Sequence, residues 1–102
     1  MVISLAPMEK YELTVIAKPN LEEKPLLGCW SRVTDLVNSG GGKVLGEDVW
    51  GKRRLAYRIG SFSEGAYAVF SLSFPAAKIA DFKRRLGLES DLLRCLVVKK
   101  LK

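Results

Sequence analysis

A run of cations followed by an alternating stretch is the part of this sequence whose residue types and spacing could do chemistry. Residues 52–54 read Lys-Arg-Arg, and the next residues alternate strictly between the two sides of an extended chain. One side carries Leu55, Tyr57 and Ile59, and the other carries Arg54, Ala56 and Arg58. A period of two is typical of a half-buried strand with one apolar and one cationic face. Such a strand could hold a rigid row of positive charge toward a phosphate backbone.

The residues around this stretch predict a long hairpin. Residues 43–59 read as one extended segment, which Gly46 and Gly51 are expected to interrupt with a bulge or a sharp twist. The run Gly-Ser-Phe-Ser-Glu-Gly at residues 60–65 predicts the turn, and residues 66–74 predict the returning strand. The core face of that strand is expected to carry Ala68, Phe70, Leu72 and Phe74.

A strand and a helix precede the hairpin. Residues 9–17 alternate as a strand, and the following helix can begin at Asn20 or Glu22. Three glycines, residues 40–42, predict the end of that helix. They do not predict a phosphate-binding loop, because such a loop precedes a helix instead of following it. The apolar stripe of the helix is Leu26, Trp30, Val33 and Val37, a spacing that favours the core for Trp30.

A second helix and a last strand complete the pattern. Pro75 is expected to start the helix and Gly87 to end it, and residues 92–98 read as a strand. This order predicts an α+β, ferredoxin-like βαββαβ fold, in which a four-stranded antiparallel sheet has two helices on one face. The helix-free face would be open to a partner. We expect a flexible N-terminal extension at residues 1–7 and one domain at residues 8–102.

Charge is divided unevenly along the chain, whose formal net charge is +6. Residues 1–49 carry five basic and seven acidic side chains, whereas residues 50–102 carry twelve basic and four acidic ones. Positive charge gathered in one half favours a polyanionic partner. The alternative, a basic surface that is only solvated, stays open at this point.

The residue types argue against catalysis and against a metal or cofactor. The chain has no histidine, which removes the usual acid–base group near neutral pH and the commonest metal ligand. Two cysteines, Cys29 and Cys95, are too few for a structural zinc or iron–sulfur site, and buried free thiols are favoured over a disulfide. No nucleotide-binding fingerprint occurs, so we expect no enzyme, no cofactor and no small-molecule substrate. The apolar start of the chain is too short to span a bilayer, so no membrane partner is expected.

Five segments carry a resemblance to a known family. They are residues 8–12 (Met-Glu-Lys-Tyr-Glu), 18–21 (Lys-Pro-Asn-Leu), 51–59 (Gly-Lys-Arg-Arg-Leu-Ala-Tyr-Arg-Ile), 65–67 (Gly-Ala-Tyr) and 94–99 (Arg-Cys-Leu-Val-Val-Lys). Together they resemble the family of the sixth protein of the bacterial small ribosomal subunit, and the Arg-Arg-Leu-Ala-Tyr run is the most specific part. The resemblance implies the ferredoxin-like fold and no catalytic activity. It also implies binding to the central domain of small-subunit rRNA together with the eighteenth small-subunit protein.

The resemblance and the charge pattern together give two sets of candidate site residues. The candidate rRNA-binding residues are Lys10, Tyr11, Lys52, Arg54, Arg58, Arg94, Lys99 and Lys100. The candidate contacts with the partner protein, on the edge of the second strand, are Asp48, Arg53, Leu55 and Tyr57. For Tyr11 a place in the core is an equal alternative. Two positions depart from the family pattern: Arg58 stands where many members have proline, and Leu93 where relatives often carry another arginine.

A second function is kept beside the ribosomal one. The same fold could serve as a regulatory module that binds a small anion or a protein without RNA, with Arg53 or Arg58 holding the anion. The resemblance implies the cytoplasmic ribosome of a bacterium, with the ribosome of a chloroplast or mitochondrion as the alternative location.

Overall fold

The structure, a computed structural model, describes residues 8–20 and 22–100. The extension expected at residues 1–7 lies outside the described residues. The elements in chain order are β1 (Met8–Ala17), α1 (Glu23–Ser39), β2 (Lys43–Ile59), β3 (Phe62–Pro75), the 3₁₀ turn η1 (Ala76–Lys78), α2 (Ile79–Leu86) and β4 (Leu92–Lys99). This order confirms the predicted βαββαβ arrangement.

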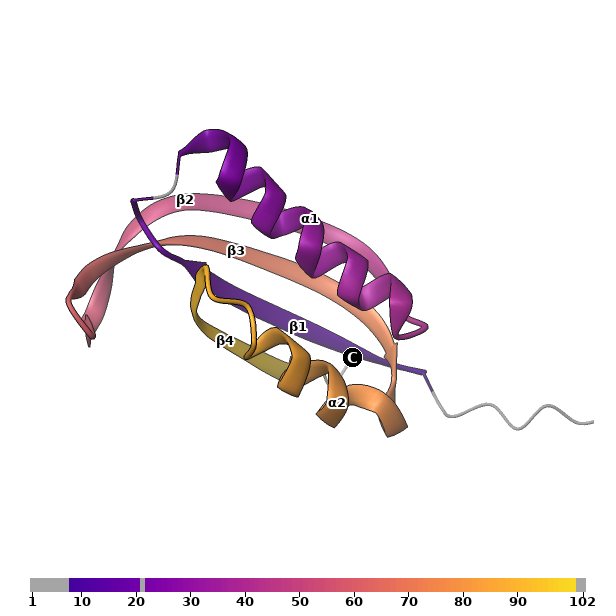
Figure 1. Cartoon of the computed structure of the whole chain (residues 1–102). Coiled ribbons are helices and arrows are strands. Elements are labelled where there is room, and N and C mark those ends of the chain that lie inside the picture. Colours follow the sequence, from indigo (N-terminus) through magenta and orange to yellow (C-terminus); the bar gives the residue numbers. More distant parts are fainter. Residues whose placement is uncertain (1–7, 21, 101–102) are drawn as a thin grey trace, which may run out of the picture.

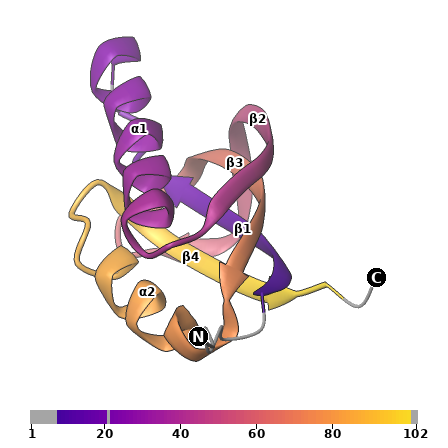
Figure 2. The ribbon, with the colours of Figure 1, turned by 90° about the vertical axis from the view of Figure 1, so that its right-hand side faces the viewer.

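The four strands form one antiparallel sheet in the order β2-β3-β1-β4. Both helices cover the same face of the sheet, and the view turned by 90° shows the opposite face without a helix (Figures 1 and 2). The core fills the space between sheet and helices. Its fully buried side chains include Leu13 and Val15 of β1, Val33 and Val37 of α1, Phe70 and Leu72 of β3, and Leu86 of α2.

The apolar stripe of α1 explains how this helix packs. Glu22 is its N-cap residue, so Pro25 falls in the first turn, where its missing N–H breaks no helical hydrogen bond. Trp30 is 4% exposed and meets the ring of Phe70 edge-on, with ring centroids 6.3 Å apart. The prediction of a core role for Trp30 is therefore confirmed.

The glycines after α1 end the helix, as expected. The Gly42 N–H donates to the Val37 carbonyl at 2.9 Å, and Gly41 adopts φ 90°, a conformation that side chains with a Cβ rarely accept. At Gly40 a Cβ would lie 2.5 Å from Phe74 Cζ, so the chain passes too close to β3 for a larger residue. The three glycines thus let the chain turn tightly from α1 into β2.

Two boundary predictions are wrong. Residues 60–65 were expected to form the turn, but β3 already begins at Phe62, because the ladder pairs Ile59 with Phe62 and Arg54 with Glu64. The turn is therefore much shorter. Pro75 does not start a helix: it is the last residue of β3, and η1 separates it from α2.

The β2–β3 hairpin makes the molecule long and narrow, with principal extents of 53 × 27 × 22 Å. The hairpin tip forms one end, and the beginning of β1 lies at the opposite end (Figure 1). Register shifts at Val44/Gly46 and Val49/Gly51 interrupt β2 where its glycines predict bulges. The ends of the hairpin and of β1 thus mark the two ends of the helix-free face.

Candidate nucleic-acid interface

Strand register shows which side chains share the helix-free face. Residues opposite each other in an antiparallel pair point to the same face. Tyr67 of β3 pairs with Ile16 of β1, and Ile16 pairs with Arg94 of β4. Ser73 pairs with both Lys10 and Lys43 at the other end. The face therefore has lysines at one end and the Arg94 region at the other.

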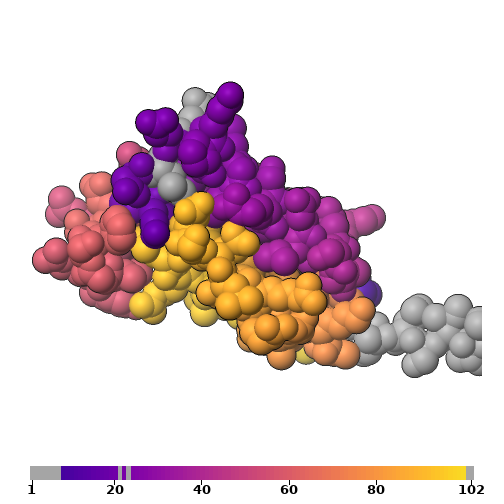
Figure 3. Space-filling view, viewed as in Figure 1, coloured from indigo at the N-terminus to yellow at the C-terminus, as the bar shows by residue number. Residues whose placement is uncertain are grey.

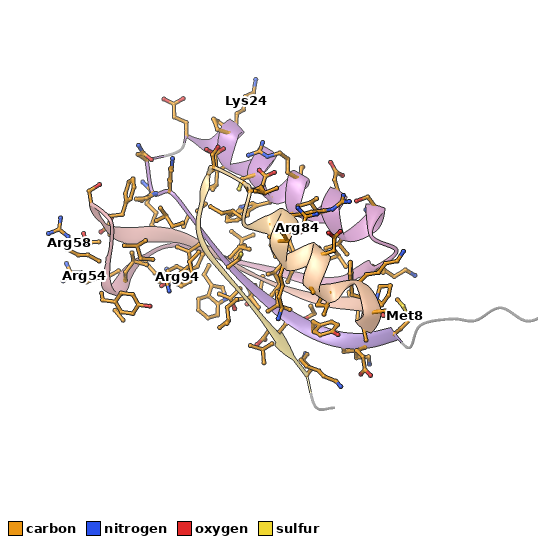
Figure 4. All side chains as sticks on the ribbon, turned by 60° about the horizontal axis from the view of Figure 1, so that its bottom comes forward. Met8, Lys24, Arg54, Arg58, Arg84 and Arg94 are labelled. Atoms are coloured by element: carbon orange, nitrogen blue, oxygen red, sulfur yellow. The ribbon has the colours of Figure 1, made fainter. Side chains whose placement is uncertain are left out.

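The predicted rRNA-binding residues separate into two groups. The terminal cluster is Lys10, Lys99 and Lys100, where the Lys100 N–H donates to the Lys10 carbonyl at 2.8 Å and Lys99 Nζ lies 3.7 Å from Glu9 Oε2. The hairpin cluster is Lys52, Arg54, Arg58 and Arg94, all exposed. Figure 4 shows Arg54, Arg58 and Arg94 near the hairpin, and Met8, at the start of β1, at the opposite end. The structure therefore gathers these residues into two separate groups, at opposite ends of the molecule.

Tyr11, the remaining predicted RNA-binding residue, belongs to the core. It is 6% exposed and packs in the main hydrophobic cluster. The alternative left open for this residue, a place in the core, is what the structure shows. Its neighbour Lys10 is exposed, as strand alternation requires.

An aromatic and arginine cluster lies beside the hairpin. The Trp50 and Tyr67 rings stack with centroids 6.1 Å apart and planes at 14°, and Trp50 Nε1 donates to Asp48 Oδ2 at 2.9 Å. The Arg94 guanidinium lies 5.5 Å from the centroid of the Tyr57 ring, within cation–π range. The sequence analysis missed these contacts. A glycine in a strand predicts a bulge, but it does not say onto which face the bulge turns Trp50.

The predicted apolar face of residues 55–59 is only partly correct. Leu55 is 8% exposed, but Tyr57 is 62% exposed, because this part of the ribbon has no helix layer against which to pack. Leu55 and Tyr57 instead line a hollow of about 200 Å³ on the helix-free side, together with Ile16, Tyr67 and Arg94. Ile16 is buried there, so β1 is covered on both faces at this point.

Among the predicted partner contacts, Asp48, Arg53 and Tyr57 are exposed on β2, whereas Leu55 lies beneath them. In the middle of the face, Leu96 and Val98 of β4 are large exposed apolar side chains.

Both cysteines are free thiols, with Cys29 buried and Cys95 partly buried. Within residues 8–20 and 22–100, no three side chains that could ligate a metal gather, and no helix is long and apolar enough to cross a membrane.

The observations define a class of protein: a ferredoxin-like α+β domain with aromatic side chains on its helix-free sheet and exposed cations at both ends of the molecule. The family model described as "Ribosomal protein S6" matches residues 10–99. The chain belongs to this family. The resemblance on residues 51–59 and the other four segments is thereby confirmed.

Curated relatives agree with the family match. The small ribosomal subunit protein bS6 of Rhodococcus opacus is 44% identical over 92 residues, which are 90% of this chain and 97% of that protein. The bS6 protein of Dictyoglomus turgidum is 38% identical over 90 residues, or 88% of this chain and 93% of that protein.

Solved structures agree on the fold. The crystal structure of 30S ribosomal protein S6 from Thermotoga maritima superposes with a TM-score of 0.86 at 22% identity, covering 92% of this chain and 89% of that one. The P2 domain of a chemotaxis kinase, solved with its response regulator, superposes with a TM-score of 0.65 at 11% identity, covering 92% of this chain and 100% of that one. Similarity at these identities shows the fold alone.

Family membership has two consequences for the predictions. The protein is a structural, non-enzymatic component of the small ribosomal subunit, so the prediction of no catalysis is confirmed. The ribosomal function is also selected over a free regulatory module, since the relatives with substantial identity carry the ribosomal name.

Proposed function

We propose that this protein binds small-subunit rRNA in the central domain and docks the eighteenth small-subunit protein beside it, in the cytoplasmic ribosome of a bacterium. The observation that carries the proposal is the gathering of exposed cations at the two ends of the long molecule. Lys10 and Arg94 lie on the helix-free face, whereas strand register places Lys52 and Arg54 on the side of Ala66 and Lys99 on the side of Tyr11. The bacterial relatives support the location.

Phosphate contacts by lysine and arginine are the mechanism that fits this surface. Two cation clusters at opposite ends of a molecule 53 Å long would contact phosphates that are far apart in the RNA. Such spacing recognises the shape of a folded RNA more than its base sequence. Arg94 is held over the Tyr57 ring, which fixes the position of its guanidinium before RNA arrives.

The edge of β2 is the proposed surface for the partner protein. β2 is an edge strand, so one row of its backbone groups is unpaired by the sheet. Asp48, Arg53 and Tyr57 are exposed along it, and Leu55 supports them from below. A protein segment could add to this edge through backbone hydrogen bonds, with the side chains supplying specificity.

The test is filter binding of a central-domain rRNA fragment, with and without the eighteenth protein, across a series of salt concentrations. We expect the logarithm of the affinity to fall with the logarithm of salt by about 0.7–0.9 per phosphate contacted. Adding the partner should tighten binding, because both proteins would then hold one RNA surface. Binding that ignores salt, or no gain from the partner, would contradict the proposal.

A further inference from the structure

A second cationic surface lies on the helix side of the molecule, opposite the proposed interface. Its four cations are Lys78, Lys83, Arg84 and Arg85, all exposed on η1 and α2. The acidic side chain within the same segment is Asp81. The two acidic side chains of the loop after α2, Glu89 and Asp91, are bound to Arg32 of α1 at 2.7 and 2.9 Å. They are therefore already occupied by an arginine of another element.

The helix dipole explains only part of this charge. Lys83, Arg84 and Arg85 lie in the last turn of α2, where cations are favourable. Lys78 is the N-cap residue of α2, at the positive end of that helix, and is also the last residue of η1. Within residues 8–20 and 22–100, neither Lys78 nor Lys83 takes part in an ion pair.

Asp81 accepts hydrogen bonds from two arginines of the same helix. Its carboxylate accepts from an Nη of Arg84 at 2.7 Å and from Nε of Arg85 at 2.9 Å. Hydrogen bonding from Arg84 lowers the pKa of the Asp81 carboxyl, so it stays ionised at neutral pH. Each guanidinium has five N–H donors and gives one of them to Asp81, which leaves donors for another acceptor.

A hollow of about 240 Å³ opens between the end of α1 and α2, beside these cations. Its floor is Leu36, Phe74 and Phe82, the two phenylalanine rings having centroids 4.8 Å apart. Its charged lining consists of Lys78, Asp81 and Arg85. Figure 3 shows α1 and α2 side by side on this face. The hollow is smaller than the roughly 300–1,000 Å³ of sites for drug-sized ligands, so it suits a single flat ring.

We propose that α2 and this hollow form a second RNA contact, which takes an unpaired nucleotide with its base in the hollow and its flanking phosphates on Lys78 and Arg85. The inference rests on the proposed function, since it adds a second contact to an RNA-binding protein. RNA is recognised largely through unpaired bases that leave the stack and enter such pockets. Because α2 and the helix-free sheet are on opposite sides, the protein would join two separate segments of rRNA.

The experiment compares three full-length variants in binding to the central-domain fragment with the eighteenth protein present. The first is Lys78→Gln with Arg85→Gln, which removes the two cations that line the hollow and leaves the Arg84–Asp81 pair intact. The matched control is Lys24→Gln, an exposed lysine on α1 that lies away from Arg84 (Figure 4). The third variant, in which Arg53, Arg54 and Arg94 become alanine, tests the proposed function separately. Cross-linking of thiouridine-substituted RNA, mapped by mass spectrometry, locates the contact.

We expect the double variant to lower the salt slope by about 1.5, as two lost phosphate contacts require, and to lose cross-links to residues 76–86. The Lys24 control should match the parent protein. An unchanged slope in the double variant, while the arginine variant loses binding, would overturn the second contact and leave the proposed function standing. A loss in the double variant alone would support the second contact and contradict the role of the helix-free face. If the double variant weakens binding to the eighteenth protein in the absence of RNA, α2 contacts protein and the inference is wrong.

Discussion

Gly65 is a buried residue of the hairpin that packs against Ile16 of β1. A Cβ at this position would overlap Ile16 Cγ2 and would lie 3.5 Å from Leu55 Cδ2. We expect Gly65→Ala to lower the free energy of unfolding by about 1–3 kcal/mol, because buried side chains would have to shift. Urea denaturation followed by circular dichroism measures the change.

Gly46→Ala is the matched control, because a Cβ there would meet nothing nearer than Ser71 Cβ at 3.9 Å. This variant should leave the free energy of unfolding unchanged or raise it by roughly 0.5 kcal/mol. Equal losses at Gly65 and Gly46 would mean that close packing against Ile16 is not the reason for glycine at position 65.

The two thiols should react slowly in the folded protein. Burial raises the pKa of the Cys29 thiol, against the opposing charge of Arg32, and burial also raises the pKa of Cys95. Because the thiolate is the reactive form, a raised pKa means less thiolate at any given pH. We expect alkylation by iodoacetamide at pH 8 to be much slower for both residues than in the urea-unfolded chain, as measured by mass spectrometry. Folded-state rates equal to unfolded ones would contradict the burial of these thiols.

At the scale of the element, Gly51 controls the shape of the hairpin. Its φ of 80° lies in the left-handed region, and a Cβ there would meet no atom within 4 Å, so any cost of substitution comes from the backbone. We expect Gly51→Ala to cost about 1–2 kcal/mol of stability and to weaken the near-ultraviolet signal of the Trp50–Tyr67 stack. Gly51→Asn should lose less, since asparagine tolerates this conformation better. Equal losses for alanine and asparagine would point away from backbone strain.

The positions of the elements could be predicted from the sequence, except at the hairpin tip and at Pro75, which ends β3 instead of starting a helix. Over most of the chain, each element packs one face against the core. The spacing of its apolar residues therefore predicts which side chains are buried, as at Trp30 of α1. Residues 60–65 are polar and glycine-rich and so predict a turn, yet strand pairing resumes at Phe62. Tyr57 follows the apolar alternation but is exposed, because no helix covers the ribbon at that point. The pattern of hydrophobic residues predicts burial only where an element packs against the core. Where an element extends beyond the core, the same pattern no longer predicts which side chains are buried.

At the scale of the whole molecule, the sequence predicted which residue types carry charge but not where they meet. Lys10 and Lys100 are ninety positions apart in the chain, and the antiparallel pairing of β1 with β4 brings them side by side. Arg94 of β4 likewise lies over the Tyr57 ring although β2 and β4 are opposite edge strands of the sheet, so neither sequence spacing nor strand order reveals this contact. The separation into a terminal and a hairpin cluster therefore depends on strand register.

Assembly into the small subunit is the measurement that tests the molecule as a whole. We expect replacement of Arg53, Arg54 and Arg94 by alanine to leave the fold intact, because all three side chains are exposed and substitutions of this kind usually change stability by less than about 0.5 kcal/mol each. The variant should nevertheless be depleted from small subunits in sucrose gradients at ordinary ionic strength, since three phosphate or partner contacts would be missing.

The matched control for this experiment replaces the same three arginines by lysine, which keeps the charge and removes the planar guanidinium. If counter-ion release supplies most of the binding energy, the lysine variant should co-sediment nearly as well as the parent protein, and raising the salt should weaken both alike. If the lysine variant is as depleted as the alanine variant, the guanidinium contacts themselves are required, as the Arg94–Tyr57 pair would suggest. Normal assembly of the alanine variant would show that the hairpin cluster does not hold this protein on its RNA.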